Sequence, residues 1–379
     1  MAFELTQEQE MIRLMARDFA KKELEPYAAK WEQEEIFPAE ALKKMGELGL
    51  LGMMIPVEYD GAGAGAVSYC LALQEIAYAC ASTAVTMSVA NLSSDPIFKY
   101  GNEEQKDKYL KPLARGEKIG SFAVTEPDAG SDPGSMTTRA EDRGDYYLIN
   151  GSKVFITTGA YAGAIILIVR TGAEKTNRGL SAFILTPDMP GFKVGRRENK
   201  MGLRASNTVE LLFDDCIMPK ENLLGKEGLG FKIAMVALDS GRIGIASQSL
   251  GIARACLHEA IGYAKTRKQF GRNISSFQAI QWMIADTAAE IEAAHWLTLS
   301  AAERKDRGLP FTREASMAKL FASEMANRAA YRALQIHGGY GYMKEYKVER
   351  LYRDARVTAI YEGTSEVQRL VIAREVMAD

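Results

Sequence analysis

The sequence lacks most features that would mark a metal-binding, nucleic-acid-binding or membrane protein. Among its 379 residues are only three histidines, and its four cysteines (Cys70, Cys80, Cys216 and Cys256) have neither metal-ligand nor CxxC spacing, so we expect them to be reduced core residues. The formal net charge is -2 and no run of like charge forms a tail, which argues against a nucleic acid as partner. No stretch of about 18 uncharged apolar residues occurs, which argues against membrane insertion.

The first residues also lack a targeting signal. The stretch "MAFELTQEQE" is acidic and contains no apolar core of the kind found in signal peptides. Together with the unpaired cysteines, this predicts a cytoplasmic protein. With 47% hydrophobic and 25% charged residues, the composition is that of an ordinary globular chain that is long enough for two or three packing units.

Two weak motifs are explained better by structure than by chemistry. Glu292–His295 has the Glu-x-x-His spacing of di-iron carboxylate proteins, but those proteins need a second such unit, and none occurs here. We therefore expect no metal, and we interpret His295 as a packing or surface residue. The glycine-rich segment 60–66 lacks the GxGxxG spacing and has no strand before it, which favours a connector between helices over a nucleotide-binding turn.

Hydrophobic periodicity divides the chain into three regions. Residues 1–118 repeat apolar side chains at helical spacing, beginning with a capping box formed by Thr6 and Gln9. Residues 119–223 contain short β-branched and aromatic segments separated by turn residues, which predicts an antiparallel sheet or small barrel. Residues 224–379 return to long amphipathic stretches with short loops, which predicts a bundle of four long helices. The predicted fold class is α+β, mostly α.

Two loop motifs have polar character that suits a ligand as well as a simple connection. "TEPDAGSD" (125–132) follows a predicted strand and offers backbone N–H groups and the hydroxyls of Thr125 and Ser131; it is either a hairpin connection or a site for a polar heterocycle or phosphate. "TRKQFG" (266–271) places Arg267 at the C-terminal end of a helix. A cation is favourable there in any case, and a guanidinium could also reach a pyrophosphate.

A third motif, "QIHGGYGY" (335–342), ends a predicted helix with more glycine than a cap requires. One glycine, Gly338, accounts for the C-cap. The additional glycines, Gly339 and Gly341, indicate that a bulky group approaches the backbone closely.

The most informative carboxylate is Glu362, in "AIYEGTSEVQRL" (359–370). Ser365 and Gln368 form a predicted capping box, and Glu362 precedes it, so stabilisation by the helix dipole does not explain this charge well. Gly363 permits backbone dihedrals that other residues resist, and a tight turn there would direct the carboxylate and a backbone N–H into one space. A base beside an oxyanion donor is what proton abstraction next to a carbonyl requires.

Together these motifs resemble those of the acyl-CoA dehydrogenases. "FAVTEPDAGSD", "FITTG", "TRKQFG", "QIHGGYGY" and "IYEGTSEVQRLVIARE" occur in the order of that family and span nearly the whole chain, in a pattern most like the short-chain bacterial type. The resemblance implies a helical domain, a β domain and a four-helix bundle, non-covalent FAD, an acyl-CoA substrate and a homotetramer built as a dimer of dimers. It also implies an electron-transfer flavoprotein as acceptor, and no dinucleotide fingerprint for NAD occurs.

The resemblance assigns flavin contacts to residues from two subunits. Phe122, Val124 and Thr125 match the loop along the isoalloxazine ring. A second wall matches Phe155, Ile156 and Thr157, with Phe155 at a position where the family often has Trp. Positions near the adenosine and pyrophosphate are matched by Thr364 and Glu366. The positions that a neighbouring subunit contributes are matched by Arg267, Gln269, Phe270, Gln278, Gln335 and Gly339.

The resemblance also places the catalytic base at Glu362. Ser131 and Arg242 match CoA-contacting positions, and Tyr361 and Gly363 are assigned to the substrate. The Glu362 N–H and a flavin ribityl hydroxyl would polarise the thioester carbonyl, so that the carboxylate takes the α-proton while the β-hydride passes to the flavin. An oxidase and a flavin-binding scaffold without catalysis are the alternatives. The intact Glu362 argues against the scaffold, and the short chain argues against the large oxidases.

The acyl group itself is open among linear short-chain, branched and cyclic forms. The stretch 82–94, which matches the family's acyl-pocket helix, contains no Arg or Lys, so a free carboxylate at the far end of the acyl group is disfavoured. Asp95 follows at a position that the family usually fills with a small or apolar residue. It is either a helix N-cap, with Pro96 at the first helical position, or a second carboxylate facing the acyl group, which would suit a cyclic substrate.

Overall fold

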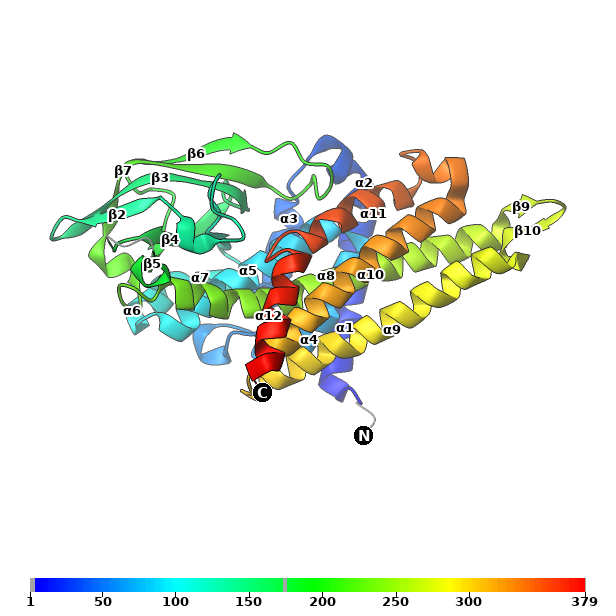
Figure 1. The fold of residues 1–379 in the computed structure, drawn as a ribbon, viewed down its shortest axis with the longest axis horizontal. Helices are drawn as coiled ribbons and strands as arrows, with labels where there is room; N and C mark the ends of the chain where they lie inside the picture. The colour runs from blue at the N-terminus through cyan, green and yellow to red at the C-terminus, as the bar shows by residue number, and fades with distance from the viewer. Residues whose placement is uncertain (1–3, 173–175, 379) are drawn as a thin grey trace.

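The computed structural model describes residues 4–172 and 176–378, and it places a β-sheet part against two helical parts (Figure 1). The first helix begins with the predicted capping box of Thr6 and Gln9. The helices of the N-terminal part are α1 (Gln7–Phe19), α2 (Glu25–Glu34), α3 (Ala39–Glu47), α4 (Gly65–Ala79), α5 (Ala81–Tyr100), α6 (Glu103–Gln105) and α7 (Lys111–Ala114).

The middle part forms, within the described residues, one eight-stranded sheet with the order β6-β7-β3-β2-β4-β5-β8 and with β1 beside β4. Most neighbours are antiparallel, as predicted, but β1 and β2 each pair with β4 in parallel. Alternating hydrophobicity does not reveal strand direction, and the long segment between β1 and β4 lets the chain return in the same sense. The strands are β1 (Ile119–Ala123), β2 (Arg139–Asp142), β3 (Tyr146–Thr157), β4 (Ala162–Arg170), β5 (Leu180–Leu185), β6 (Phe192–Arg197), β7 (Thr208–Pro219) and β8 (Leu223–Leu224).

The C-terminal part is built around three long helices that run side by side, α8 (Gly230–Thr266), α9 (Gln278–Asp306) and α10 (Thr312–His337). The fourth predicted helix, α11 (Lys347–Arg356), has only ten residues, so the expectation of four long helices is wrong in length. The last helix, α12 (Ser365–Ala378), packs against α10. A small hairpin of β9 (Lys268–Gln269) and β10 (Arg272–Asn273) projects at the end of the molecule that lies away from the sheet (Figure 1).

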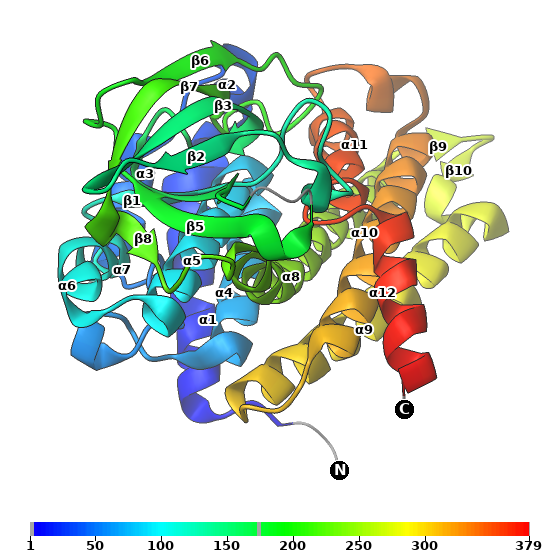
Figure 2. The ribbon, with the colours of Figure 1, turned by 60° about the vertical axis from the view of Figure 1, so that its left-hand side comes forward.

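Helices α4 and α5 are the centre of the molecule. Both pack against α8, and α5 also packs against β1, so that α5 lies between the sheet and the long helices (Figure 2). From Ala81 to Ile97 every residue of α5 is buried. A helix enclosed on all sides needs no polar face, which is why its sequence shows little amphipathic pattern.

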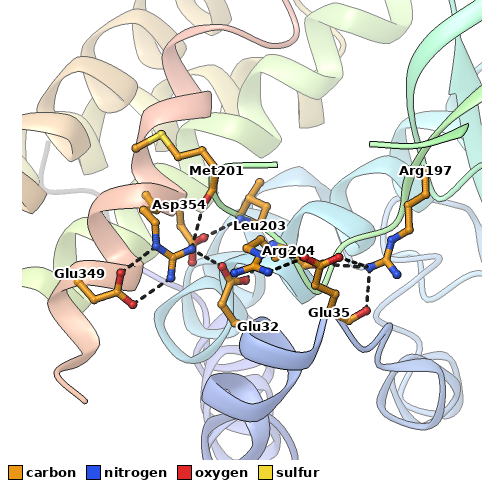
Figure 3. A network of polar contacts seen from close by, with 9 residues as sticks. Glu32, Glu35, Arg197, Met201, Leu203, Arg204, Glu349 and Asp354 are labelled. Atoms are coloured by element: carbon orange, nitrogen blue, oxygen red, sulfur yellow. Dashed lines mark hydrogen bonds and ion pairs between the residues drawn. The ribbon is translucent and has the colours of Figure 1, made fainter. Parts of the chain in front are cut away.

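A polar network joins the three parts of the chain at one point (Figure 3). The loop before β7 donates its Leu203 N–H to Asp354 on α11 at 2.7 Å and its Arg204 N–H to Glu32 on α2 at 2.8 Å. Arg353 on α11 donates to Glu32 at 2.6 Å and to the Met201 carbonyl at 2.9 Å. Burial raises the pKa of Asp354 to about 7, and the nearby Glu32 adds to this effect.

The structure describes the cysteines, the hydrophobicity of the helices and the grouping of possible metal ligands. All four cysteines are buried and free, as expected. No helix in residues 4–172 and 176–378 is long and apolar enough to cross a membrane. Within the same residues, no three His, Cys, Asp or Glu side chains gather in a way that could hold a metal ion.

Candidate active site

The predicted tight turn at Glu362 is present, and its backbone is unusual. Glu362 has φ +51° and Gly363 has φ +93°, so two consecutive residues lie in the left-handed region. A side chain at positive φ is uncommon, and such strain persists only where surrounding contacts hold it. Here the Lys319 ammonium on α10 donates to the Gly363 carbonyl at 2.7 Å, and the Gln368 amide donates to the carbonyls of Glu362 and Gly363 at 3.2 and 3.1 Å.

The cap of α12 differs from the prediction. Thr364, not Ser365, caps the helix, because its hydroxyl accepts the Val367 N–H at 3.3 Å. Ser365 instead donates to Glu324 on α10 at 2.6 Å. The side chain of Gln368, which a capping box would direct to the N-cap N–H, supports the Glu362 turn instead.

The Glu362 side chain is partly buried, and its carboxylate lies against α8 and α5. Its Oε2 atom is buried and has no hydrogen-bond partner among the described residues. A Cβ added to Gly241 of α8 would lie 2.0 Å from this oxygen and 3.1 Å from Leu92 of α5, so the glycine provides the room that the carboxylate occupies. Burial raises the pKa of Glu362 to about 7, although the charges of Lys319 and Arg242 act to lower it.

Two predicted substrate residues are close to Glu362: Tyr361 precedes it in the chain, and the charge of Arg242 acts on its carboxylate. Arg242 is buried on α8, is ion-paired to Asp239, and leaves its Nε without a partner in the described part of the chain. The Tyr361 hydroxyl donates to Gln248 of α8. Ser131 is exposed and lies on the loop after β1. The structure shows no contact between Ser131 and Glu362 among the described residues.

The two segments predicted to face a flavin, 122–125 and 155–157, lie side by side where β1 and β3 end. Phe122 and Val124 are half-buried, and Thr125 accepts the Val154 N–H at 2.9 Å, which ties the two segments to each other. Phe155 has φ +60°, and 63% of its side chain is exposed. The Ile156 side chain is buried in the sheet core, so only its backbone is available to a ligand. An exposed aromatic beside half-buried apolar residues fits the flat face of an isoalloxazine ring.

The predicted partner-subunit residues gather at the other end of the molecule (Figures 1 and 2). Arg267, Gln269 and Gly339 line a cavity of about 540 Å³ between the end of α8 and the end of α10. Phe270, at the tip of the β9–β10 hairpin, is 93% exposed. Gln278 begins α9 directly after the hairpin, and Gln335 lies near the end of α10.

The three glycines of the 335–342 motif have separate explanations. Gly338 has φ +59° and ends α10, as the cap interpretation requires. Gly341 packs against backbone, because a Cβ there would lie 2.4 Å from the Leu334 carbonyl oxygen. Gly338 and Gly339 both have open space where a Cβ would stand, and Gly339, whose φ does not require glycine, is the one that the close approach of another group would explain.

Asp95 is not a helix cap. It lies inside α5, with Pro96 also in the helix interior, so the N-cap interpretation is wrong. Its buried carboxylate accepts from Lys99 at 2.9 Å and from the Ser240 hydroxyl at 3.3 Å. Ser240 precedes Gly241, so Asp95 and Glu362 contact neighbouring residues of α8.

The motifs did not reveal Lys319 and Gly241 as site residues, and they indicated Gln368 only as part of a capping box. Each contacts Glu362 or its turn. A signal existed for Lys319 alone, since a lysine on the buried face of an amphipathic helix requires a partner. The partner, the Gly363 carbonyl, is 44 positions away in sequence, and no local pattern identifies it.

Comparison with known proteins shows to which class this fold and this site belong. Family models described as the N-terminal, middle and C-terminal domains of acyl-CoA dehydrogenase match residues 6–117, 121–216 and 228–377. The chain belongs to the acyl-CoA dehydrogenase family, whose members are FAD-dependent oxidoreductases.

Individual relatives are similar over their full length. The short-chain specific acyl-CoA dehydrogenase of Clostridium acetobutylicum is 50% identical over 99% of this chain and 100% of its own. The structure of butyryl-CoA dehydrogenase from Megasphaera elsdenii superposes with a TM-score of 0.97 at 44% identity, covering all of both chains. A chain from the structural work on the electron transferring flavoprotein of Acidaminococcus fermentans gives a TM-score of 0.98 at 48% identity, again with full coverage of both.

Proposed function

We propose that the protein dehydrogenates a short-chain acyl-CoA thioester with Glu362 as the base that removes the α-proton. The observation that carries this proposal is the Glu362 carboxylate itself: its Oε2 atom is buried and has no hydrogen-bond partner within the described residues, and desolvation raises its pKa to about 7. A general base is most effective when its pKa lies near the working pH. The strained turn holds this carboxylate in place, and the Glu362 N–H would donate to the thioester oxygen.

The residues of this chain would hold FAD through the segments 122–125 and 155–157. Bound FAD supplies the acceptor for the β-hydride of the acyl group. Phe122, Val124 and Phe155 provide apolar surface for the ring, and the half-buried Thr157 offers a hydroxyl at its edge. Thr364 and Glu366, at the start of α12, are proposed to face the adenosine and pyrophosphate portion.

A second copy of the chain is proposed to complete each flavin site. Segments 122–125 and 155–157 lie on the sheet, whereas Arg267, Phe270 and Gly339 lie at the opposite end of the helices (Figure 1). Because the two sets lie far apart in one chain, we assign the second set to the flavin of a neighbouring subunit. This arrangement supports the expected homotetramer, a dimer of dimers. Each subunit is proposed to consist of three domains, at 1–118, 119–223 and 224–379.

The proposed substrate is a short, compact acyl group, and the proposed electron acceptor is an electron-transfer flavoprotein. The similarity to short-chain enzymes and to butyryl-CoA dehydrogenase supports the first part, and the similarity to a chain from work on an electron transferring flavoprotein supports the second. Rapid reoxidation of the substrate-reduced enzyme by air would favour an oxidase instead.

A cyclic acyl-CoA is the second candidate substrate, because Asp95 places another carboxylate beside Ser240 on the same helix that Glu362 contacts. A rigid ring could present a second carbon acid to that carboxylate. A panel of straight, branched and cyclic acyl-CoA esters, scored by turnover with each, distinguishes the two.

The Glu362 assignment is tested by Glu362→Gln, which keeps the shape of the side chain and removes its basicity. FAD binding should persist, and anaerobic bleaching of the flavin by butyryl-CoA should slow by a factor on the order of 10³ or more. A matched control is Glu104→Gln, an exposed glutamate on α6 to which no cofactor or substrate role is assigned. Near-normal bleaching by Glu362→Gln would refute the assignment.

A further inference from the structure

Lys153 is a lysine without solvent contact in the middle of the β-sheet part. It lies on β3, and its side chain is fully buried. A buried ammonium is unfavourable unless its donors are paired. Its Nζ donates to the Val124 carbonyl at 2.9 Å and to the Glu126 carboxylate at 2.8 Å, and it contacts the Met136 sulfur at 3.6 Å.

Glu126 is held in turn by the chain that follows it. Its carboxylate accepts the Thr137 N–H at 2.6 Å, the Thr138 N–H at 3.0 Å and the Thr137 hydroxyl at 3.0 Å. Every acceptor of the Lys153 ammonium therefore comes from the loop between β1 and β2, which contains Val124 and Thr125 of segment 122–125. The residue after Lys153 adds a backbone link, since the Val154 N–H donates to the Thr125 carbonyl at 2.9 Å.

Lys153 also stands where β3 changes its course. The pairing of β3 with β7 shifts register between Lys153 and Ile156. A bulge of this kind interrupts the alternation of side chains and directs one of them out of the pattern. The residue so directed is Phe155, with φ +60° and a largely exposed ring.

The charges of the pair persist at neutral pH. Burial lowers the pKa of Lys153 to about 8, although Glu126 acts to raise it. Burial acts to raise the pKa of Glu126, but Lys153 and the threonine donors outweigh it and bring that pKa to about 2. An ionised donor strengthens the hydrogen bond to the Val124 carbonyl.

We propose that Lys153 is a positioning residue that fixes segments 122–125 and 155–157 at the separation and angle that the flavin ring requires. The proposal rests on the assignment of these two segments to the flavin made above. Because its side chain is fully buried, Lys153 would contact neither the cofactor nor the substrate. It acts through the Val124 carbonyl on one side and through the bulge before Phe155 on the other.

The alternative to be excluded is a pair that only stabilises the fold. Three variants of the full-length FAD-loaded enzyme separate the two roles: Lys153→Met, Glu126→Gln and the double variant. Lys153→Met alone leaves a buried carboxylate unpaired and could fail to fold. The double variant removes both charges together, so its thermal unfolding temperature should recover toward wild type. Lys193→Met, an exposed lysine on β6, is the matched control.

The positioning role predicts that the flavin does not recover with the fold. In the double variant the dissociation constant for FAD should remain raised on the order of tenfold, and the flavin absorbance maxima and reduction potential should remain shifted, because the Val124 carbonyl has lost its donor. Lys153→Arg keeps the positive charge, so its FAD affinity, absorbance maxima and reduction potential should lie closer to wild type than those of Lys153→Met. If the double variant has wild-type FAD affinity, spectrum and potential, the proposal is overturned and the pair is structural.

Phe155→Ala separates this result from a failure of the flavin assignment. An altered flavin spectrum in Phe155→Ala, together with a wild-type flavin in the folded Lys153 variants, overturns the positioning role alone. A wild-type flavin in Phe155→Ala overturns the wall assignment, and with it the proposal. Altered spectra in both, with a recovered unfolding temperature in the double variant, support it.

Discussion

The charge of Lys319 should set the pH at which the proposed base becomes active. Lys319 lies on α10 with its side chain buried, and its positive charge acts to lower the pKa of Glu362 against the effect of burial. Replacing it with Met keeps most of the side-chain volume and removes the charge. The pKa of Glu362 should then rise above about 7, its value in the intact site.

The magnitude follows from the ionised fraction of the base. With a pKa of about 7, about half of Glu362 is ionised at pH 7, and kcat/KM should fall about tenfold for each pH unit below that. Loss of a nearby opposite charge raises a carboxyl pKa by about 1 to 2 units. In Lys319→Met the ionised fraction at pH 7 would then be about one tenth to one hundredth, so the rate at pH 7 should drop about 5- to 50-fold.

The assay is the pH dependence of kcat/KM from pH 5.5 to 9.5 with butyryl-CoA, which reports ionisations of the free enzyme. Lys319 also donates to the Gly363 carbonyl, so its loss could distort the turn. A charge effect is recovered at alkaline pH, and a distorted turn is not. Lys319→Arg, which keeps the charge, should retain the wild-type midpoint. An unchanged midpoint in Lys319→Met, or a uniform loss with no alkaline recovery, would show that this charge does not set the pKa of the base.

Three further predictions concern subunit contact, the second carboxylate and stability. Arg267→Ala should weaken FAD retention and tetramer stability together on dilution, measured by flavin fluorescence and sedimentation, and unchanged FAD affinity would contradict a contribution from the neighbouring subunit. Asp95→Asn keeps a hydrogen-bond acceptor for Ser240, and its stability and its turnover of straight, branched and cyclic esters are measured. If stability is unchanged and only the turnover of cyclic esters is lost, Asp95 is catalytic. If the turnover of all esters is unchanged, that role is excluded. The pKa of Asp354 is raised by burial and by Glu32, so the folded protein favours the protonated carboxyl. The stability that this protonated form contributes is full below about pH 4 and is lost as pH rises through about 7. Asp354→Asn should therefore gain unfolding free energy relative to wild type between pH 5 and pH 8 in urea titrations, and a constant difference across that range would contradict the raised pKa.

Local patterns in the sequence predicted what local interactions determine. The capping box of Thr6 and Gln9 and the left-handed Gly363 depend on residues a few positions apart, and both are present. The sheet was predicted from alternation, but the parallel pairing of β1 with β4 depends on how the intervening chain returns, which alternation does not encode.

Asp95 shows why a strong local signal can be misleading. Asp before Pro is a common start of a helix, and it was interpreted as one. In the structure α5 continues through Pro96. The helix is buried on all sides, and its packing against β1 and α8 outweighs the local preference of one Asp-Pro pair to begin a helix.

The environment of Glu362 was beyond local prediction for a physical reason. Its carboxylate lies against Gly241 of α8 and Leu92 of α5, its turn is held by Lys319 of α10, and its own segment leads into α12. These four segments come from distant parts of the chain and meet only when α8 packs between α5 and α10. The raised pKa is therefore a property of that packing and not of the motif "YEGTSE". A loosened core would let water reach the carboxylate, return its pKa toward that of an ordinary glutamate and weaken it as a base, even with every residue of the motif in place.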